Sequence, residues 1–109
     1  MEIRANRFGE KAVFATKSYK KGEVIHELRG KILKSPTRTS IEIDKDKHVE
    51  DRYGRYINHS FEPSASVTGN KLIALRDINE GEEITFDYTV SESNISHPFV
   101  DKTTNKLVS

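Results

Sequence analysis

Residues 54–63 concentrate polar side chains that could do chemistry. The segment reads Gly-Arg-Tyr-Ile-Asn-His-Ser-Phe-Glu-Pro and places Asn58, His59 and Ser60 in a row. Asn, His and Ser supply hydrogen-bond donors and acceptors that suit a polar small molecule. Taken alone, the segment is also typical of a polar turn that holds a structural histidine.

A second dense segment, residues 83–88, follows about 25 residues later and reads Glu-Ile-Thr-Phe-Asp-Tyr. Phe86 and Tyr88 are two positions apart, so on an extended strand their rings would share one face. A pair of this kind belongs more often to a core than to a site. The order and spacing of the two segments favour a site instead.

Both segments resemble signatures of one family. Residues 55–63 resemble the Arg-Phe-x-Asn-His-Ser-Cys-x-Pro signature of SET-domain protein-lysine methyltransferases, and residues 81–88 resemble Gly-Glu-Glu-Leu-Thr-(Phe/Tyr)-Asp-Tyr. Residues 12–25 look like the N-terminal strands of that family, and residues 40–44 are similar to the strand before the Asn-His segment. The resemblance covers about residues 8–90.

The resemblance implies a mostly β SET-domain fold of small, twisted antiparallel sheets with little helix and a C-terminal pseudoknot. It also implies S-adenosyl-L-methionine as cofactor on one face and a lysine-containing protein substrate that enters a narrow channel from the other. The catalytic residues would be Tyr88 and Phe86. The cofactor-binding residues would be Asn58, His59, Arg55, Tyr56, Lys11, Gly9, Ala12 and Phe99.

The chemistry suits these side chains. Methyl transfer from a sulfonium to an amine depends mainly on alignment and electrostatics, so Tyr88 is expected to orient the amine rather than act as a base. In the family that the chain resembles, Phe at the position of Phe86 leaves space beside the amine, which implies addition of two or three methyl groups. The alternative is a catalytically silent SET-like module that binds cofactor or peptide.

Several departures from the family pattern bear on this choice. Gly9-Glu10-Lys11-Ala12 replaces the usual Gly-x-Gly segment, and Phe61 replaces the usual Cys. The zinc-binding Cys-rich tail is absent, and Phe99 stands near its position. Phe99 either covers the adenine or plugs the core from a docked tail.

Residue choice predicts the elements that must position these groups. Ile, Val and Thr make up 25 of the 109 residues, and β-branched side chains favour strands. A helical turn is expected around residues 52–57 and another short helical stretch near Glu80. Residues 1–90 are expected to form the SET domain and residues 91–109 a short tail; residues 34–39 and this tail look least structured. The expected strands are residues 2–6, 12–16, 24–28, 31–33, 40–43, 64–67, 72–74 and 84–86.

Composition bounds the remaining possibilities. The net charge is +1, with 18 Lys+Arg against 17 Asp+Glu, so no charge excess argues for nucleic-acid or membrane partners. The absence of Cys excludes disulfides and thiolate zinc sites, and the four His lack metal-ligand spacing, so no metal is expected. No apolar run approaches a membrane span and no export signal is visible, which predicts a soluble intracellular protein of the cytoplasm, or of a host cell if viral. The small, zinc-free chain is typical of a bacterial or viral protein, and the short loop at residues 34–39 is compatible with a homodimer that completes the peptide groove.

Overall fold

The computed structural model describes residues 1–93, 95 and 98–109. Its strands are two to five residues long, as expected for a chain rich in β-branched residues interrupted by Gly-containing turns. The strands are β1 (Glu2–Ala5), β2 (Lys11–Phe14), β3 (Val24–Glu27), β4 (Gly30–Leu33), β5 (Ile41–Asp44), β6 (Lys47–Asp51), β7 (Asn58–His59), β8 (Ala65–Thr68), β9 (Lys71–Ala74), β10 (Glu83–Phe86), β11 (Phe99–Val100) and β12 (Leu107–Val108). The helical elements are the 3₁₀ turn η1 (Gly54–Tyr56) and the single-turn helix α1 (Tyr88–Ser91).

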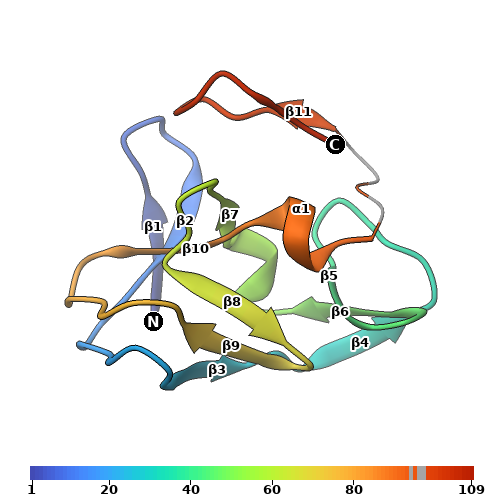
Figure 1. Cartoon of the computed structure of the whole chain (residues 1–109), viewed down its shortest axis with the longest axis horizontal. Helices are drawn as coiled ribbons and strands as arrows, with labels where there is room; N and C mark the ends of the chain where they lie inside the picture. The colour runs from blue at the N-terminus through green and yellow to red at the C-terminus, as the bar shows by residue number, and fades with distance from the viewer. Residues whose placement is uncertain (94, 96–97) are drawn as a thin grey trace.

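The strands form several small sheets that wrap around one core (Figure 1). Their orders are β1-β2-β10-β7, β3-β9-β8, β4-β6-β5 and the tail hairpin β11-β12. Among the described residues, all strand pairings are antiparallel except that of β10 with β7, where Thr85 lies opposite Asn58 and Phe86 opposite His59. This parallel pairing places the two candidate site segments, residues 54–63 and 83–88, side by side.

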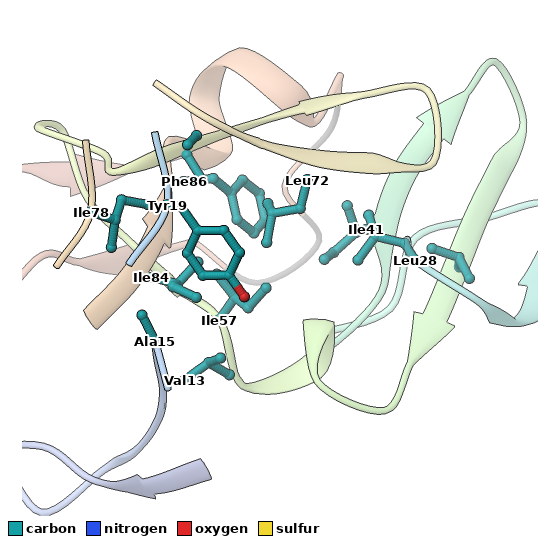
Figure 2. Packing of buried hydrophobic residues seen from close by; sticks show 13 residues of the cluster. Val13, Ala15, Tyr19, Leu28, Ile41, Ile57, Leu72, Ile78, Ile84 and Phe86 are labelled. Carbon is teal, nitrogen blue, oxygen red and sulfur yellow. The ribbon is translucent and has the colours of Figure 1, made fainter. Parts of the chain in front are cut away.

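The core is built mainly from aliphatic side chains of β2, β5, β6, β8, β9 and β10 and of the segments between the strands (Figure 2). Ile57, just before β7, is 1% exposed, and Ile84 in β10 is fully buried. Phe86 extends this core toward the start of α1, and it is 3% exposed. Burial of several Val, Leu and Ile side chains, each contributing about 1.5–3 kcal/mol, anchors the two strands that carry the motifs.

The mostly β fold and the predicted strands are confirmed, with end shifts of one or two residues. The structure adds β6, which pairs with both β4 and β5. Sequence reasoning missed this strand because four of its five residues are polar or charged, although His48, Val49 and Asp51 are buried. The turn at residues 52–57 is confirmed as η1.

The prediction of a short helix near Glu80 is wrong. Residues 80 and 81 form a turn in which Gly81 adopts φ 89°, a left-handed conformation that glycine tolerates. Tyr88 also lies beyond its strand, because β10 ends at Phe86 and Tyr88 begins α1. Asp87 caps that helix: its carboxylate accepts the Thr89 N–H at 2.9 Å. Within the described residues, no helix is long and apolar enough to cross a membrane.

Candidate active site

The site is built where β7 and β10 run side by side. Beyond the ladder, the Ser60 N–H donates to the Phe86 carbonyl at 3.1 Å. The Tyr88 N–H donates to Nδ1 of His59 at 3.0 Å. Residues 58–60 therefore hold the backbone of residues 85–88 through the strand ladder, the Ser60–Phe86 bond and the His59–Tyr88 bond.

Tyr88 is fixed by its hydroxyl as well as by its backbone. The O–H donates to the Ile57 carbonyl at 2.5 Å, and the ring lies 4.7 Å from the ring of Phe86. Burial raises the pKa of Tyr88 well above its usual value, and the nearby Glu92 and Glu83 charges raise it further. The phenol therefore stays protonated at neutral pH. Its only proton is already donated, so its oxygen offers acceptor lone pairs.

His59 acts as a buried neutral connector. Its Nδ1 accepts the Tyr88 N–H, which assigns the ring proton to Nε2. Burial lowers the pKa of His59, although the charges of Asp87 and Asp101 oppose that shift. Nε2 is buried without a hydrogen-bond partner among the described residues.

A cleft of about 550 Å³ opens beside these groups. A smaller one of about 260 Å³ shares several of the same side chains and adds His59. Between them, the two clefts bring together six of the predicted site residues: Arg55, Asn58, His59, Phe86, Tyr88 and Phe99.

Four predicted cofactor contacts do not line either cleft. Gly9 is exposed in the β1–β2 turn with φ 77°, and Ala12 is fully buried in β2. Tyr56 packs against the core, and Lys11 places its Nζ 5.3 Å from the centre of the Tyr56 ring. The role of these four residues in cofactor binding stays a prediction.

Asn58 connects three elements at the cleft wall. Its side-chain amide donates to the Glu83 carboxylate at 3.2 Å and contacts the Lys11 carbonyl at 3.5 Å. Burial raises the pKa of Glu83, while the Asn58 bond lowers it. Asn58 thus ties the start of β2 to β7 and β10, with its side chain at the border of both clefts.

The tail forms a hairpin over one side of this region (Figure 1). Phe99 is 38% exposed, and its ring centroid lies 5.9 Å from that of Tyr88 and 6.1 Å from that of His59. Val108 is fully buried, and Lys102 pairs with Glu10 at 3.0 Å. Phe99 therefore borders both clefts as a partly open ring and does not fill the core. His97, which precedes Pro98 and Phe99 in the sequence, lies outside the described residues.

Sequence reasoning missed two parts of the cleft wall. Residues 37–39, part of the loop at residues 34–39 expected to be least structured, are organised around Glu50, whose carboxylate accepts the hydroxyls of Thr37 and Thr39. The second is Glu92, which lines the large cleft. Its position four residues after Tyr88 was a usable signal, because residues four apart share a helix face. That signal requires knowing that a helix begins at Tyr88.

Comparisons with known proteins agree with this geometry. A model of the SET domain matches residues 10–89. A Yarrowia lipolytica protein described as a histone-lysine N-methyltransferase, H3 lysine-36 specific, is 32% identical over 103 residues, and the match spans 70% of this chain but 13% of that protein. A Plasmodium falciparum crystal structure described as a "putative histone methyltransferase" has the same fold, with a TM-score of 0.63 at 23% identity over 80% of this chain and 94% of that one. Because the family model covers most of the sequence and the two matching motifs meet at one cleft, this chain belongs to the SET-domain family.

Proposed function

We propose that this chain is an S-adenosyl-L-methionine-dependent protein-lysine N-methyltransferase that adds two or three methyl groups to one lysine. One observation carries the proposal: the Tyr88 hydroxyl is fixed on the Ile57 carbonyl beside Phe86, in a cleft bordered by Asn58. An aromatic wall with a preorganised acceptor oxygen is what a methyl transfer to an amine requires.

The residues present fit the cofactor. Asn58 supplies an amide, His59 a buried Nε2–H donor without a described partner, and Phe99 a partly exposed ring that can cover an aromatic base. These three would hold S-adenosyl-L-methionine, with residues 1–90 as the catalytic unit and the tail of residues 91–109 closing over it. Arg55, at the edge of the large cleft, adds a positive charge for an acidic group.

When bound, S-adenosyl-L-methionine supplies a methyl group on a positively charged sulfonium. The chain's own task is to align a neutral amine, although a free lysine has a pKa of about 10.4. The rings of Phe86 and Tyr88 make part of the wall apolar, and an apolar environment favours the neutral amine. The Tyr88 oxygen accepts from the amine or from polarised C–H groups, since its own proton is held by Ile57.

The test is direct transfer. The chain is incubated with methyl-labelled S-adenosyl-L-methionine and an array of lysine peptides that includes histone H3 sequences, and the products are identified by mass spectrometry. Calorimetry with S-adenosylhomocysteine measures cofactor binding separately. Binding without transfer to any peptide would favour the silent module; absence of both would refute the proposal.

Asn58→Ala is expected to weaken cofactor affinity about 5- to 150-fold, because a lost hydrogen bond at a buried polar site costs about 1–3 kcal/mol. Calorimetry with S-adenosylhomocysteine measures the change. Asn70→Ala, at an exposed hairpin turn between β8 and β9, is the matched control and should bind normally. Equal affinity of a folded Asn58→Ala chain and the control would remove Asn58 from the site.

Phe86→Tyr is expected to shift the product toward a single methyl group. Phe86 is buried against Tyr88, so an added hydroxyl and its ordered water would occupy space that a methylated amine needs to rotate. Mass spectrometry of one methylated peptide compares the product states of both chains. A wild-type product that stops at one methyl would contradict the argument from channel width.

A further inference from the structure

Glu92 places a carboxylate in the same cleft as Tyr88 and Phe86. It follows α1 directly, and its N–H donates to the Tyr88 carbonyl at 2.9 Å. Residues four apart on one helical turn lie on the same face, so the side chains of Tyr88 and Glu92 are neighbours. Both line the large cleft together with Phe86. Burial is the main cause of the raised pKa of Tyr88, and the Glu92 charge adds to it.

A backbone N–H of β5 orients the Glu92 carboxylate. The N–H of Glu42 in β5 donates to Glu92 Oε2 at 2.7 Å. The carboxylate of Glu42 itself is engaged by Ser93, whose N–H and hydroxyl donate at 2.9 and 2.6 Å. Of these two acidic side chains, Glu92 lines the large cleft and Glu42 does not. The backbone N–H of Glu42 holds the Glu92 carboxylate in place.

The charge of Glu92 is only partly satisfied by this arrangement. Burial raises the pKa of Glu92 to about 7; the Glu42 N–H lowers it and the Glu42 carboxylate raises it. The other charged groups that line the cleft are Glu10, Arg38, Arg55 and Lys102. A half-buried carboxylate is stabilised most by a cation that enters beside it.

We propose that Glu92 forms a cation subsite of this cleft and receives the ammonium group of the substrate lysine beside Tyr88 and Phe86. The assignment of the cation to the target lysine rests on the proposed methyltransferase function. The subsite itself rests on the position of Glu92 alone. It would draw the charged side chain into the cleft, where the ammonium gives its proton to solvent water before methyl transfer, which makes Glu92 a positioning residue for the reaction.

The test uses n-butylammonium chloride, the side-chain analogue of lysine, titrated into ¹⁵N-labelled protein. We expect shifts of the Tyr88 and Glu92 amide signals and an affinity about tenfold weaker in Glu92→Gln, between the effects of exposed and buried charge pairs. The substituted amide side chain retains an acceptor oxygen for the Glu42 N–H. Glu80→Gln, in an exposed turn outside the cleft, is the matched control and should bind as the wild type does. Equal binding by Glu92→Gln, or no binding by the wild type, would overturn the subsite.

A pH profile tests the same carboxylate without any variant. Between pH 6 and 8 the probe stays cationic while Glu92 loses its proton, so wild-type affinity should rise across this range. The Glu92→Gln variant keeps the other titratable groups, which are Glu42, its β6 neighbour His48, Tyr88 and the charged groups of the cleft wall. The affinity of this variant should therefore not change across the same pH range. A parallel rise in both proteins would assign the effect to another group and refute the role of Glu92.

Peptide assays separate the two proposals. The assay uses an array peptide that the wild-type protein methylates. Replacing the target lysine of this peptide by norleucine should abolish the difference in affinity between wild type and Glu92→Gln. If neutralising a neighbouring basic residue abolishes it instead, the cation is that neighbour and the assignment to the target lysine fails. Because the n-butylammonium titration needs no methyl transfer, it reports on the subsite even if no peptide is methylated.

Discussion

Replacing Tyr88 by phenylalanine is expected to lower the rate of methyl transfer about 100-fold or more while changing cofactor affinity little. The substitution removes one oxygen that the Ile57 carbonyl holds in place at 2.5 Å. Preorganised polar groups at a reacting centre typically contribute factors of about 10²–10³ to turnover. The ring and its packing against Phe86 remain, so the cleft keeps its shape.

Single-turnover methylation of an array peptide measures the rate, and calorimetry with S-adenosylhomocysteine measures cofactor binding. Tyr53→Phe is the matched control, because Tyr53 packs on His26 away from both clefts. A fully active Tyr88→Phe chain would show that the hydroxyl has no role in transfer. An equal loss in the Tyr53→Phe control would indicate a general effect on folding.

Asp51→Ala is expected to destabilise the domain by about 3–5 kcal/mol, a large part of the roughly 5–15 kcal/mol that holds a domain of this size. Asp51 is 3% exposed, and its carboxylate contacts His26 Nε2 at 2.9 and 3.0 Å. It also accepts the N–H groups of Arg29, Tyr53 and Gly54 at 2.7–2.9 Å. Removing the carboxylate leaves the buried Gly54 N–H, and the partly buried N–H groups of Arg29 and Tyr53, without this acceptor.

The pH dependence of this effect has a defined sign. Burial alone would raise the pKa of Asp51, but the His26 contact and the donated N–H groups hold it below its usual value of 3.8. The stabilisation is therefore fully present above about pH 4 and is lost as pH falls through the lowered pKa. Urea unfolding at pH 7 and pH 3 measures it, with the exposed Asp44→Ala as control. A stability gap at pH 7 no larger than that of Asp44→Ala would contradict the structural role of Asp51.

This effect would reach the site through η1. Asp51 ends β6 and holds the N–H of Gly54, the first residue of the 3₁₀ turn. That turn leads to Ile57, whose carbonyl positions the Tyr88 hydroxyl. A Cβ atom added at Gly54 would lie 2.8 Å from Ile41 Cδ1, so glycine also serves close packing here. The stability of the β6–η1 junction and the geometry of Tyr88 are therefore linked.

The sequence by itself determined the strand-rich fold class and the motif residues of the cleft. β-branched residues between Gly-containing turns are a local signal, and strands such as β2, β9 and β10 follow from it within one or two residues. Asn58, His59, Phe86 and Tyr88 stand in two short segments whose residue types can be recognised without knowing what they contact.

Only the tertiary structure decided which polar groups are buried and which charges face the cleft. β6 reads as a polar segment, yet it is a central strand because β4 and β5 pair with it on both sides. Glu42 and Glu92 are 50 residues apart, and the bond between them depends on α1 packing beside β5. Burial and electrostatic neighbours arise from such long-range pairing, and a local residue pattern contains no information about the distance between segments that the fold brings together.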